Sequence, residues 1–324
     1  MSVLHFSVHA QDFLSSQYYS NLPVFNPGFT GIDDFTDVKL SGYQGWNSFN
    51  ISNNNVYASV FSSLNNAQQI TIKNNALRLS PTAYKQMESQ KELRRKHGMG
   101  GVVSSRNVGP YKSFSVNYQY AFHLPLSSSV NLSLGTRIGF TNQRIDFSGF
   151  TVRDEINDIF FQQLAKANNG NQDSYTTDFG LLLYSKKFYA GLSTTNLVKG
   201  KLSNDGILSF IDSKRFQFHT TGVLNLAANV QLNVGGYVFL QEGYDLGWAG
   251  NLRARYKELL YMGVSYNKNA QLSLLFGLSV NSTVNLHYSY DQYLSSLSNF
   301  NVNAHEIVLG FSLSNRAKSQ PKFW

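Results

Sequence analysis

Residues 271–280 read Gln-Leu-Ser-Leu-Leu-Phe-Gly-Leu-Ser-Val, and this stretch decides the fold class. Its apolar side chains alternate with small or polar ones, at Leu272, Leu274, Phe276, Leu278 and Val280. Alternation with a period of two predicts a β-strand whose two faces differ in polarity. The same pattern returns in residues 230–238 and 306–313. The chain from Arg215 to Leu313 is therefore expected to form consecutive strands, each with one apolar, aromatic face and one polar face.

Two β-architectures can accommodate such strands. In a soluble sandwich a second sheet covers the apolar face, whereas in a transmembrane barrel that face contacts lipid and the polar face lines the lumen. Charged residues make up only 14% of the 324 residues, and aromatic residues make up another 14%. Soluble proteins average about 25% charged residues, and aromatic side chains collect at both membrane interfaces of a barrel. The composition therefore favours a barrel over a sandwich or a β-solenoid.

The connections between the strands favour the same fold. We count about 14 strands, and long and short connections alternate from the fourth strand onward. Short periplasmic turns and long outer loops are typical of bacterial outer-membrane barrels. No run of about 18 apolar residues occurs, so no transmembrane helix is predicted. The sequence thus predicts an all-β fold, a transmembrane antiparallel β-barrel with short helical inserts in its loops.

The chain divides into four predicted parts. Residues 1–10 resemble the remnant of a signal peptide, because Val8-His9-Ala10 matches a small-x-small cleavage box. Residues 11–35 are irregular, residues 36–313 form the barrel, and residues 314–324 form a polar tail. A lumen of this width is too wide for side chains alone to fill. We therefore predict that the irregular residues 11–34 act as a plug inside the barrel.

Helical inserts are expected in two connections. Thr82–Lys96 is rich in helix-forming residues and ends in a basic cluster, which is favourable near a helix C-terminus. Arg153–Ala167 places its apolar residues at helical spacing. The second helix lies within the long connection Asn142–Ser174, and Asn196–Ser213 is predicted to be another long loop.

Charge and cysteine content exclude several kinds of site. The formal net charge is +8, but the basic residues are scattered and match no nucleic-acid-binding signature. We predict a basic lumen or basic loops and no nucleic-acid partner. The absence of cysteine excludes disulfides and thiolate metal sites. No catalytic or phosphate-binding motif is present, so neither an enzyme nor a cofactor is predicted.

Histidines and arginines on polar strand faces are the candidate site residues. His123, His219 and His287 lie on different strands, so isolated lumen histidines are expected rather than a metal site or a proton relay. Three arginines are expected to face the lumen, at Arg137, Arg253 and Arg255. They could form an anion-selective constriction. The preferred interpretation is salt bridges to the lumen carboxylates Asp245, Asp291 or Glu306.

A set of short motifs resembles one known family. The opening residues Gln17 and Tyr18 precede a run of six, Asn26-Pro27-Gly28-Phe29-Thr30-Gly31. Similar motifs follow in the same order at residues 118–126, 188–191, 288–291 and 305–309. Together they resemble the PorP/SprF family of outer-membrane barrels in type IX secretion and gliding motility. The motif residues carried over from the family, in a structural or plug role, are Gln17, Tyr18, Asn26, Pro27, Gly28, Phe29 and Gly31.

The resemblance implies a non-enzymatic protein of the bacterial outer membrane, in contact with its lipid. It implies a partner or anchor in the export of a large surface protein such as an adhesin. Its expected partners are the C-terminal domain of the secreted surface protein and components of the secretion or gliding machinery. The hypothesis assigns cargo binding to the two long outer loops and machinery binding to the basic Thr82–His97 segment. The alternative is a channel or transporter for small solutes, which bilayer conductance would distinguish.

Overall fold

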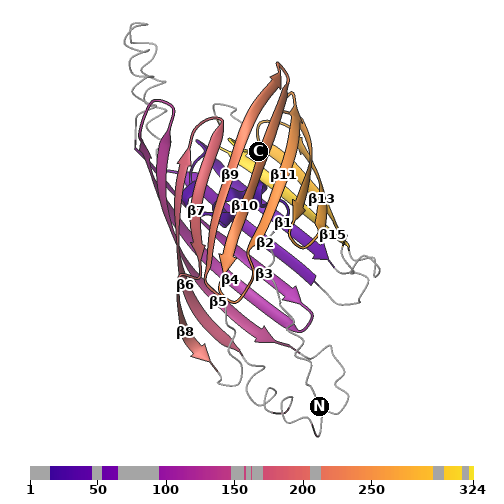
Figure 1. The fold of residues 1–324 in the computed structure, drawn as a ribbon. Coiled ribbons are helices and arrows are strands. Elements are labelled where there is room, and N and C mark those ends of the chain that lie inside the picture. The colour runs from indigo at the N-terminus through magenta and orange to yellow at the C-terminus, as the bar shows by residue number, and fades with distance from the viewer. Residues whose placement is uncertain are drawn as a thin grey trace.

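The computed structural model describes residues 15–45, 53–64, 95–146, 157, 162, 171–204, 213–294, 303–315 and 321–324. Strands dominate this part of the chain, and the short helical turns η1, α1 and η2 precede the first strand (Figure 1). Among the described residues, no helix is long and apolar enough to cross a membrane. In chain order the elements are η1 (Tyr18–Asn21), α1 (Leu22–Phe25), η2 (Pro27–Phe29), β1 (Thr36–Gly45), β2 (Asn53–Ser63), β3 (Lys96–Val108), β4 (Tyr111–Pro125), β5 (Asn131–Ile145), β6 (Gln172–Tyr184), β7 (Phe188–Thr195), β8 (Val198–Asn204), β9 (Arg215–Ala227), β10 (Val230–Gln241), β11 (Gly247–Tyr256), β12 (Leu260–Asn267), β13 (Gln271–Ser279), β14 (Val284–Tyr293) and β15 (Asn303–Leu313).

The strands form one closed antiparallel barrel. Apart from β7 and β8, each strand pairs with its neighbours in sequence, and the first strand, β1, pairs with the last, β15, along its whole length. Strands β7 and β8 occupy one position, because β6 pairs with β7 through Gly180–Tyr184 and with β8 through Gln172–Thr177. The barrel therefore has 14 strand positions, which confirms the fold class and the strand number expected from the sequence.

The break between β7 and β8 corrects one prediction. Residues 196–213 were expected to be a loop, but β8 lies within them. Asn196 interrupts the strand in the left-handed region at φ 58°, and its N–H donates to Asp178 Oδ1 at 2.6 Å. The alternation resumes at Val198, Gly200 and Leu202, so pairing with β6 resumes as well. Because Asn196 interrupts the alternation, the sequence pattern did not predict that the strand continues after it as β8.

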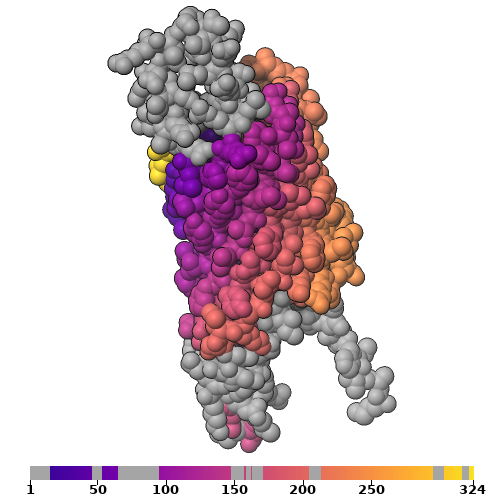
Figure 2. All heavy atoms as spheres, turned by 90° about the vertical axis from the view of Figure 1, so that its left-hand side faces the viewer, coloured from indigo at the N-terminus to yellow at the C-terminus, as the bar shows by residue number. Residues whose placement is uncertain are grey.

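The outer face of the barrel is apolar. Large hydrophobic side chains point outward from every part of the wall, and Ile138 on β5, for example, is 59% exposed. Figure 2 shows one side of this wall as a continuous surface of successive strands. Exposing so much contiguous apolar surface to water would cost free energy, whereas contact with lipid would not. The period-two alternation therefore places the lipid-facing and lumen-facing residues as predicted.

The core of the molecule lies inside the barrel. Residues 15–35, which we call the lumen segment, form the short helical turns η1, α1 and η2 and pack against the inward faces of strands on opposite sides (Figure 1). Residues 321–324 are called the tail segment, and its Phe323 and Trp324 join the same buried cluster. The predicted helices Thr82–Lys96 and Arg153–Ala167 lie almost entirely outside the described residues.

Candidate functional site: the filled lumen

Asn26 is the most densely bonded residue of the lumen segment. Its Oδ1 accepts the N–H of Gly28 at 2.7 Å, which caps the short turn η2. Its Nδ2 lies 2.7 Å from His219 Nε2 and also contacts the carbonyl oxygens of Leu181 and Leu192, at 3.3 and 3.2 Å. One side chain thus shapes its own turn and fastens that turn to strands β6, β7 and β9.

Glycines of the wall allow the lumen segment to approach the strands closely. A Cβ added to Gly135 on β5 would lie 2.3 Å from the Pro27 carbonyl group. One added to Gly180 on β6 would lie 2.0 Å from Asn26 Oδ1 and 2.8 Å from the Gly28 nitrogen. Real Cβ atoms never approach this closely, so any side chain at either position would displace the segment.

A second close approach lies at Gly31 and Gly98 on β3. Gly31 adopts φ +71°, and a Cβ there would lie 2.5 Å from the Gly98 Cα atom. Thr30, the residue before Gly31, binds the wall through both its side chain and its backbone. Its hydroxyl donates to Gln119 Oε1 at 2.9 Å, and its carbonyl oxygen lies 2.9 Å from His123 Nε2. The residues from Asn26 to Gly31 are therefore held individually by the wall.

The start of the lumen segment is held by β11, β14 and β15. Gln17 is 1% exposed, and its Nε2 donates to Ser289 Oγ at 3.1 Å and to the Glu306 carbonyl oxygen at 2.9 Å. The Tyr18 hydroxyl accepts a hydrogen bond of 2.6 Å from Asn251 Nδ2. Burial removes the hydrogen bonds that these polar groups would make to water. The bonds within the protein replace them and so offset the cost of burial.

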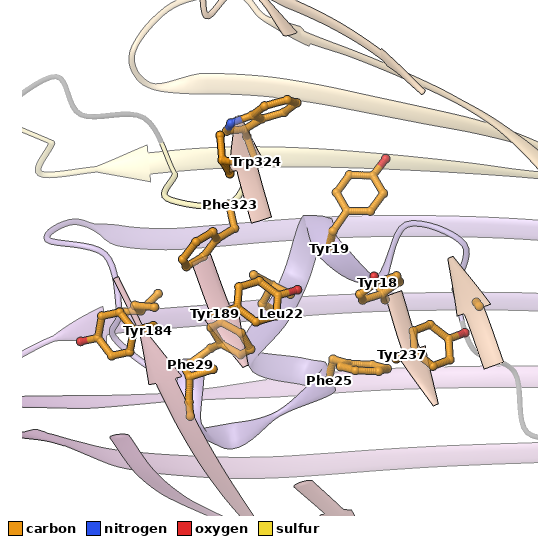
Figure 3. Packing of buried hydrophobic residues seen from close by; sticks show 14 of the residues in the cluster. Tyr18, Tyr19, Leu22, Phe25, Phe29, Tyr184, Tyr189, Tyr237, Phe323 and Trp324 are labelled. Atoms are coloured by element: carbon orange, nitrogen blue, oxygen red, sulfur yellow. The ribbon is translucent and has the colours of Figure 1, made fainter. Parts of the chain in front are cut away.

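An aromatic cluster fills the remaining space of the lumen (Figure 3). Tyr18 packs edge-on against Tyr237 of β10, with ring centroids 4.9 Å apart. Phe29 is fully buried and packs edge-on against Tyr189 of β7, also at 4.9 Å. Complete burial of one such ring stabilises the packed state by about 2–3 kcal/mol. The cluster therefore places packed aromatic rings in the interior of the barrel.

Arg137 on β5 forms a buried ion pair within the wall and also binds the lumen segment. Its Nε lies 2.7 Å from Asp178 Oδ2 on β6, and both side chains are less than a tenth exposed. Its Nη1 donates to the Val24 carbonyl oxygen at 2.7 Å. Asp178 in turn fixes Asn196 at the break between β7 and β8.

Arg253 and Arg255 of β11 do not form the salt bridges expected from the sequence. Arg253 is fully buried, with its guanidinium 3.6 Å above the Tyr19 ring and its Nη1 donating to the Trp324 carbonyl oxygen. Arg255 donates to Gln231 Oε1 at 2.6 Å. Two of the carboxylates expected as partners bind other residues: Asp245 pairs with Lys268, and Glu306 accepts from Ser15. The expectation was wrong because the tail segment occupies the arginines.

The three predicted lumen histidines are buried but are not brought together. His123 and His219 bind the lumen segment, and His287 contacts the Tyr261 hydroxyl. Within the described part of the chain, no three His, Cys, Asp or Glu side chains are grouped as a metal site would require. The chemistry that this lumen offers is hydrogen bonding to peptide groups and packing of aromatic rings.

The lumen segment leaves the barrel at the end where β1 begins. There Lys96 Nζ donates to the Ile32 and Asp33 carbonyl oxygens, at 2.8 and 3.1 Å, and pairs with Asp34 at 2.8 Å. Burial raises the pKa of the Asp33 carboxyl above its ordinary value, and the ammonium group of Lys322 opposes that shift. Charged groups therefore surround the mouth of the lumen, while the interior is aromatic.

Sequence reasoning missed two components of this site. The first is the set of wall glycines Gly98, Gly135 and Gly180, which the sequence pattern does not distinguish from other glycines in strands. The second is the tail segment, which the sequence predicts to be part of a polar tail, yet Phe323 is 2% exposed and Trp324 is 6% exposed. Two adjacent aromatic residues at the end of an otherwise polar stretch were the available signal.

A closed antiparallel barrel with a lipid-compatible outer face and a filled lumen defines the class of outer-membrane β-barrel proteins. The sequence profile described as "Type IX secretion system membrane protein PorP/SprF" matches residues 7–311. The chain therefore belongs to the PorP/SprF family, and it is a protein of the bacterial outer membrane. This confirms the family and the location expected from the sequence.

Solved structures show only a distant likeness, and no curated protein matches the sequence. The outer membrane protein Omp33 of Acinetobacter baumannii is 10% identical, with 87% of this chain and 100% of that chain covered and a TM-score of 0.48. The Pseudomonas putida toluene transporter TodX is 10% identical, with 89% and 92% covered and a TM-score of 0.46. The KdgM porin is 6% identical, with 86% and 99% covered and a TM-score of 0.38.

Proposed function

We propose that this protein is a closed outer-membrane scaffold that partners and anchors a large surface protein exported by type IX secretion. One observation carries the proposal: the lumen segment and the tail segment occupy the barrel interior. They contact strands on opposite sides, from Ser59 on β2 and Gln119 on β4 to Asn251 on β11 and Ser289 on β14. A lumen filled by its own chain is suited to holding a partner, not to conducting solutes.

In this proposal the residues outside the strands bind the partners. The lumen segment is the plug, and the connections on the side opposite the start of β1 grip the C-terminal domain of the secreted protein. Those connections include residues 146–171 and 205–214, which join β5 to β6 and β8 to β9. The basic stretch 82–97 contacts components of the secretion or gliding machinery at the other end.

Bilayer conductance tests whether the barrel is closed. We expect the native protein, inserted into planar bilayers, to show no large stable currents, because the interior is packed. A variant lacking residues 15–32 should open channels, while Leu252→Ala on the outer face should remain closed. Large, stable currents from the native protein would support a channel for small solutes instead.

Purification from native outer membranes tests the partner role. The protein carrying an affinity tag is cross-linked in intact cells, purified, and its bound proteins are identified by mass spectrometry. We expect a large secreted surface protein together with secretion or gliding components. Recovery of neither from cells that contain the folded barrel would contradict the proposal.

A further inference from the structure

The tail segment enters the lumen beside the start of β1 and inserts two aromatic side chains. The Phe323 ring packs edge-on against Tyr189 of β7, with centroids 4.7 Å apart, and lies 6.5 Å from the Phe29 ring. Figure 3 shows Phe323 directed into the aromatic cluster and Trp324 on the opposite side of the tail. The tail segment therefore touches both the wall and the lumen segment.

An arginine pair on β11 holds the main chain and the indole of the tail segment. Arg253 donates to the carbonyl oxygens of Phe323 and Trp324, the first at 3.5 Å. Its own orientation is fixed by Asn251 Oδ1, 3.2 Å from its Nε. Arg255 lies 4.3 Å from the centroid of the Trp324 ring. Arg253 therefore binds the main chain, and the guanidinium of Arg255 stacks on the ring. Together they favour an aromatic residue at position 324.

The basic residue of the tail segment is recognised by a separate group of atoms. The Nζ of Lys322 donates to the Ile32 carbonyl oxygen, and its backbone N–H lies 3.3 Å from Asp33 Oδ1. The same ammonium group lies 5.7 Å from the centroid of the Tyr184 ring. Carbonyl, carboxylate and aromatic partners together favour a cation at this position.

We propose that this mouth of the barrel is a binding site for a short cationic–aromatic peptide, and that residues 321–324 occupy it in cis. Residues 321–324 are not part of a strand, and the partners described above for Lys322, Phe323 and Trp324 belong to the lumen segment or to strands far away in sequence. A free peptide with the same side chains can make the same contacts. Occupancy stabilises the lumen segment through Phe29, Ile32 and Asp33. The proposal does not depend on the identity of the secreted protein.

A peptide-binding measurement tests the site. The chain truncated after Asn315 is purified in nanodiscs and titrated with fluorescently labelled Pro-Lys-Phe-Trp. Because a tethered segment has a millimolar effective concentration, the full-length chain should bind this peptide about tenfold more weakly or worse than the truncated chain. Pro-Lys-Ala-Ala should not bind, and Arg255→Gln should weaken binding in the truncated chain. Equal binding of the two peptides would overturn the proposal.

Cysteine accessibility tests whether the tail segment stabilises the lumen segment. It uses the full-length chain and so does not require the truncated chain to fold. The chain contains no cysteine, so Ser20→Cys gives a single label site in the buried turn η1. In the full-length chain, replacing both Phe323 and Trp324 by alanine should speed maleimide labelling at least about tenfold. Added Pro-Lys-Phe-Trp should slow it again. Labelling that is unchanged by the double substitution, in a barrel that remains heat-modifiable on gels, would contradict the proposal.

Discussion

At the scale of single residues, Asn26 concentrates the most bonding in one side chain. Replacing it by alanine removes the cap on Gly28 and the contact with His219, and leaves buried polar groups without a partner. We expect Asn26→Ala to lower the free energy of unfolding by about 2–3 kcal/mol. Urea titration of the barrel in lipid vesicles, followed by tryptophan fluorescence, measures this change.

The matched control for Asn26 is Asn225→Ala. Asn225 lies on the exposed part of β9, where its Oδ1 accepts an exposed hydrogen bond from Gln231. A substitution there should change the free energy of unfolding by no more than about 0.5 kcal/mol. Equal effects of the two variants would show that the bonds of Asn26 contribute little.

The Arg137–Asp178 pair gives a second prediction at this scale. Arg137→Met leaves the Asp178 carboxylate buried without its cation, and the expected cost is about 3–5 kcal/mol of unfolding free energy. Combining it with Asp178→Asn should recover part of that loss, because the uncompensated charge is gone. Strictly additive costs in this double-mutant cycle, measured by the same titration, would exclude the proposed coupling.

At the scale of elements, the lumen segment and the wall fit together through glycines. Gly135→Val suits a strand, because β-branched residues favour strands, but its Cβ would overlap the Pro27 carbonyl group. We expect the barrel to form with the lumen segment displaced. A cysteine at position 20 should then be labelled about tenfold faster than in the parent.

Gly222→Val is the matched control for that change. Gly222 also lies within a strand, β9, but a Cβ added there meets no atom within 4 Å. Labelling at position 20 should therefore stay at the parent rate. Accelerated labelling in both variants would mean that any bulky residue in the wall loosens the lumen segment, regardless of the contact with Pro27.

The elements also show why prediction from the sequence succeeds in one place and fails in another. Strands such as β5 and β13 were predictable because each residue's polarity reports its face. Strand β8 was not predictable, because Asn196 interrupts the alternation. Its backbone N–H is bound by Asp178 of another strand, and the local sequence does not show this contact. The fastening of Asn26–Gly31 depends on Gly98, Gly135 and Gly180, which are distant in sequence. Local patterns carry no information about which distant residues meet.

At the scale of the whole molecule, the lipid-facing wall gives the last prediction. Ile138 lies at the middle of β5 and points outward, between the exposed Leu134 and Phe140. Ile138→Lys should lower the free energy of unfolding in lipid vesicles by about 2–4 kcal/mol, because a charge at the bilayer midplane is poorly solvated. Leu132→Lys, near the end of the same strand and on the same face as Ile138, should cost no more than about 1 kcal/mol, because interfacial water reaches it. Urea unfolding in vesicles separates the two, and similar costs for both variants would mean that the middle of this face does not lie at the centre of the bilayer.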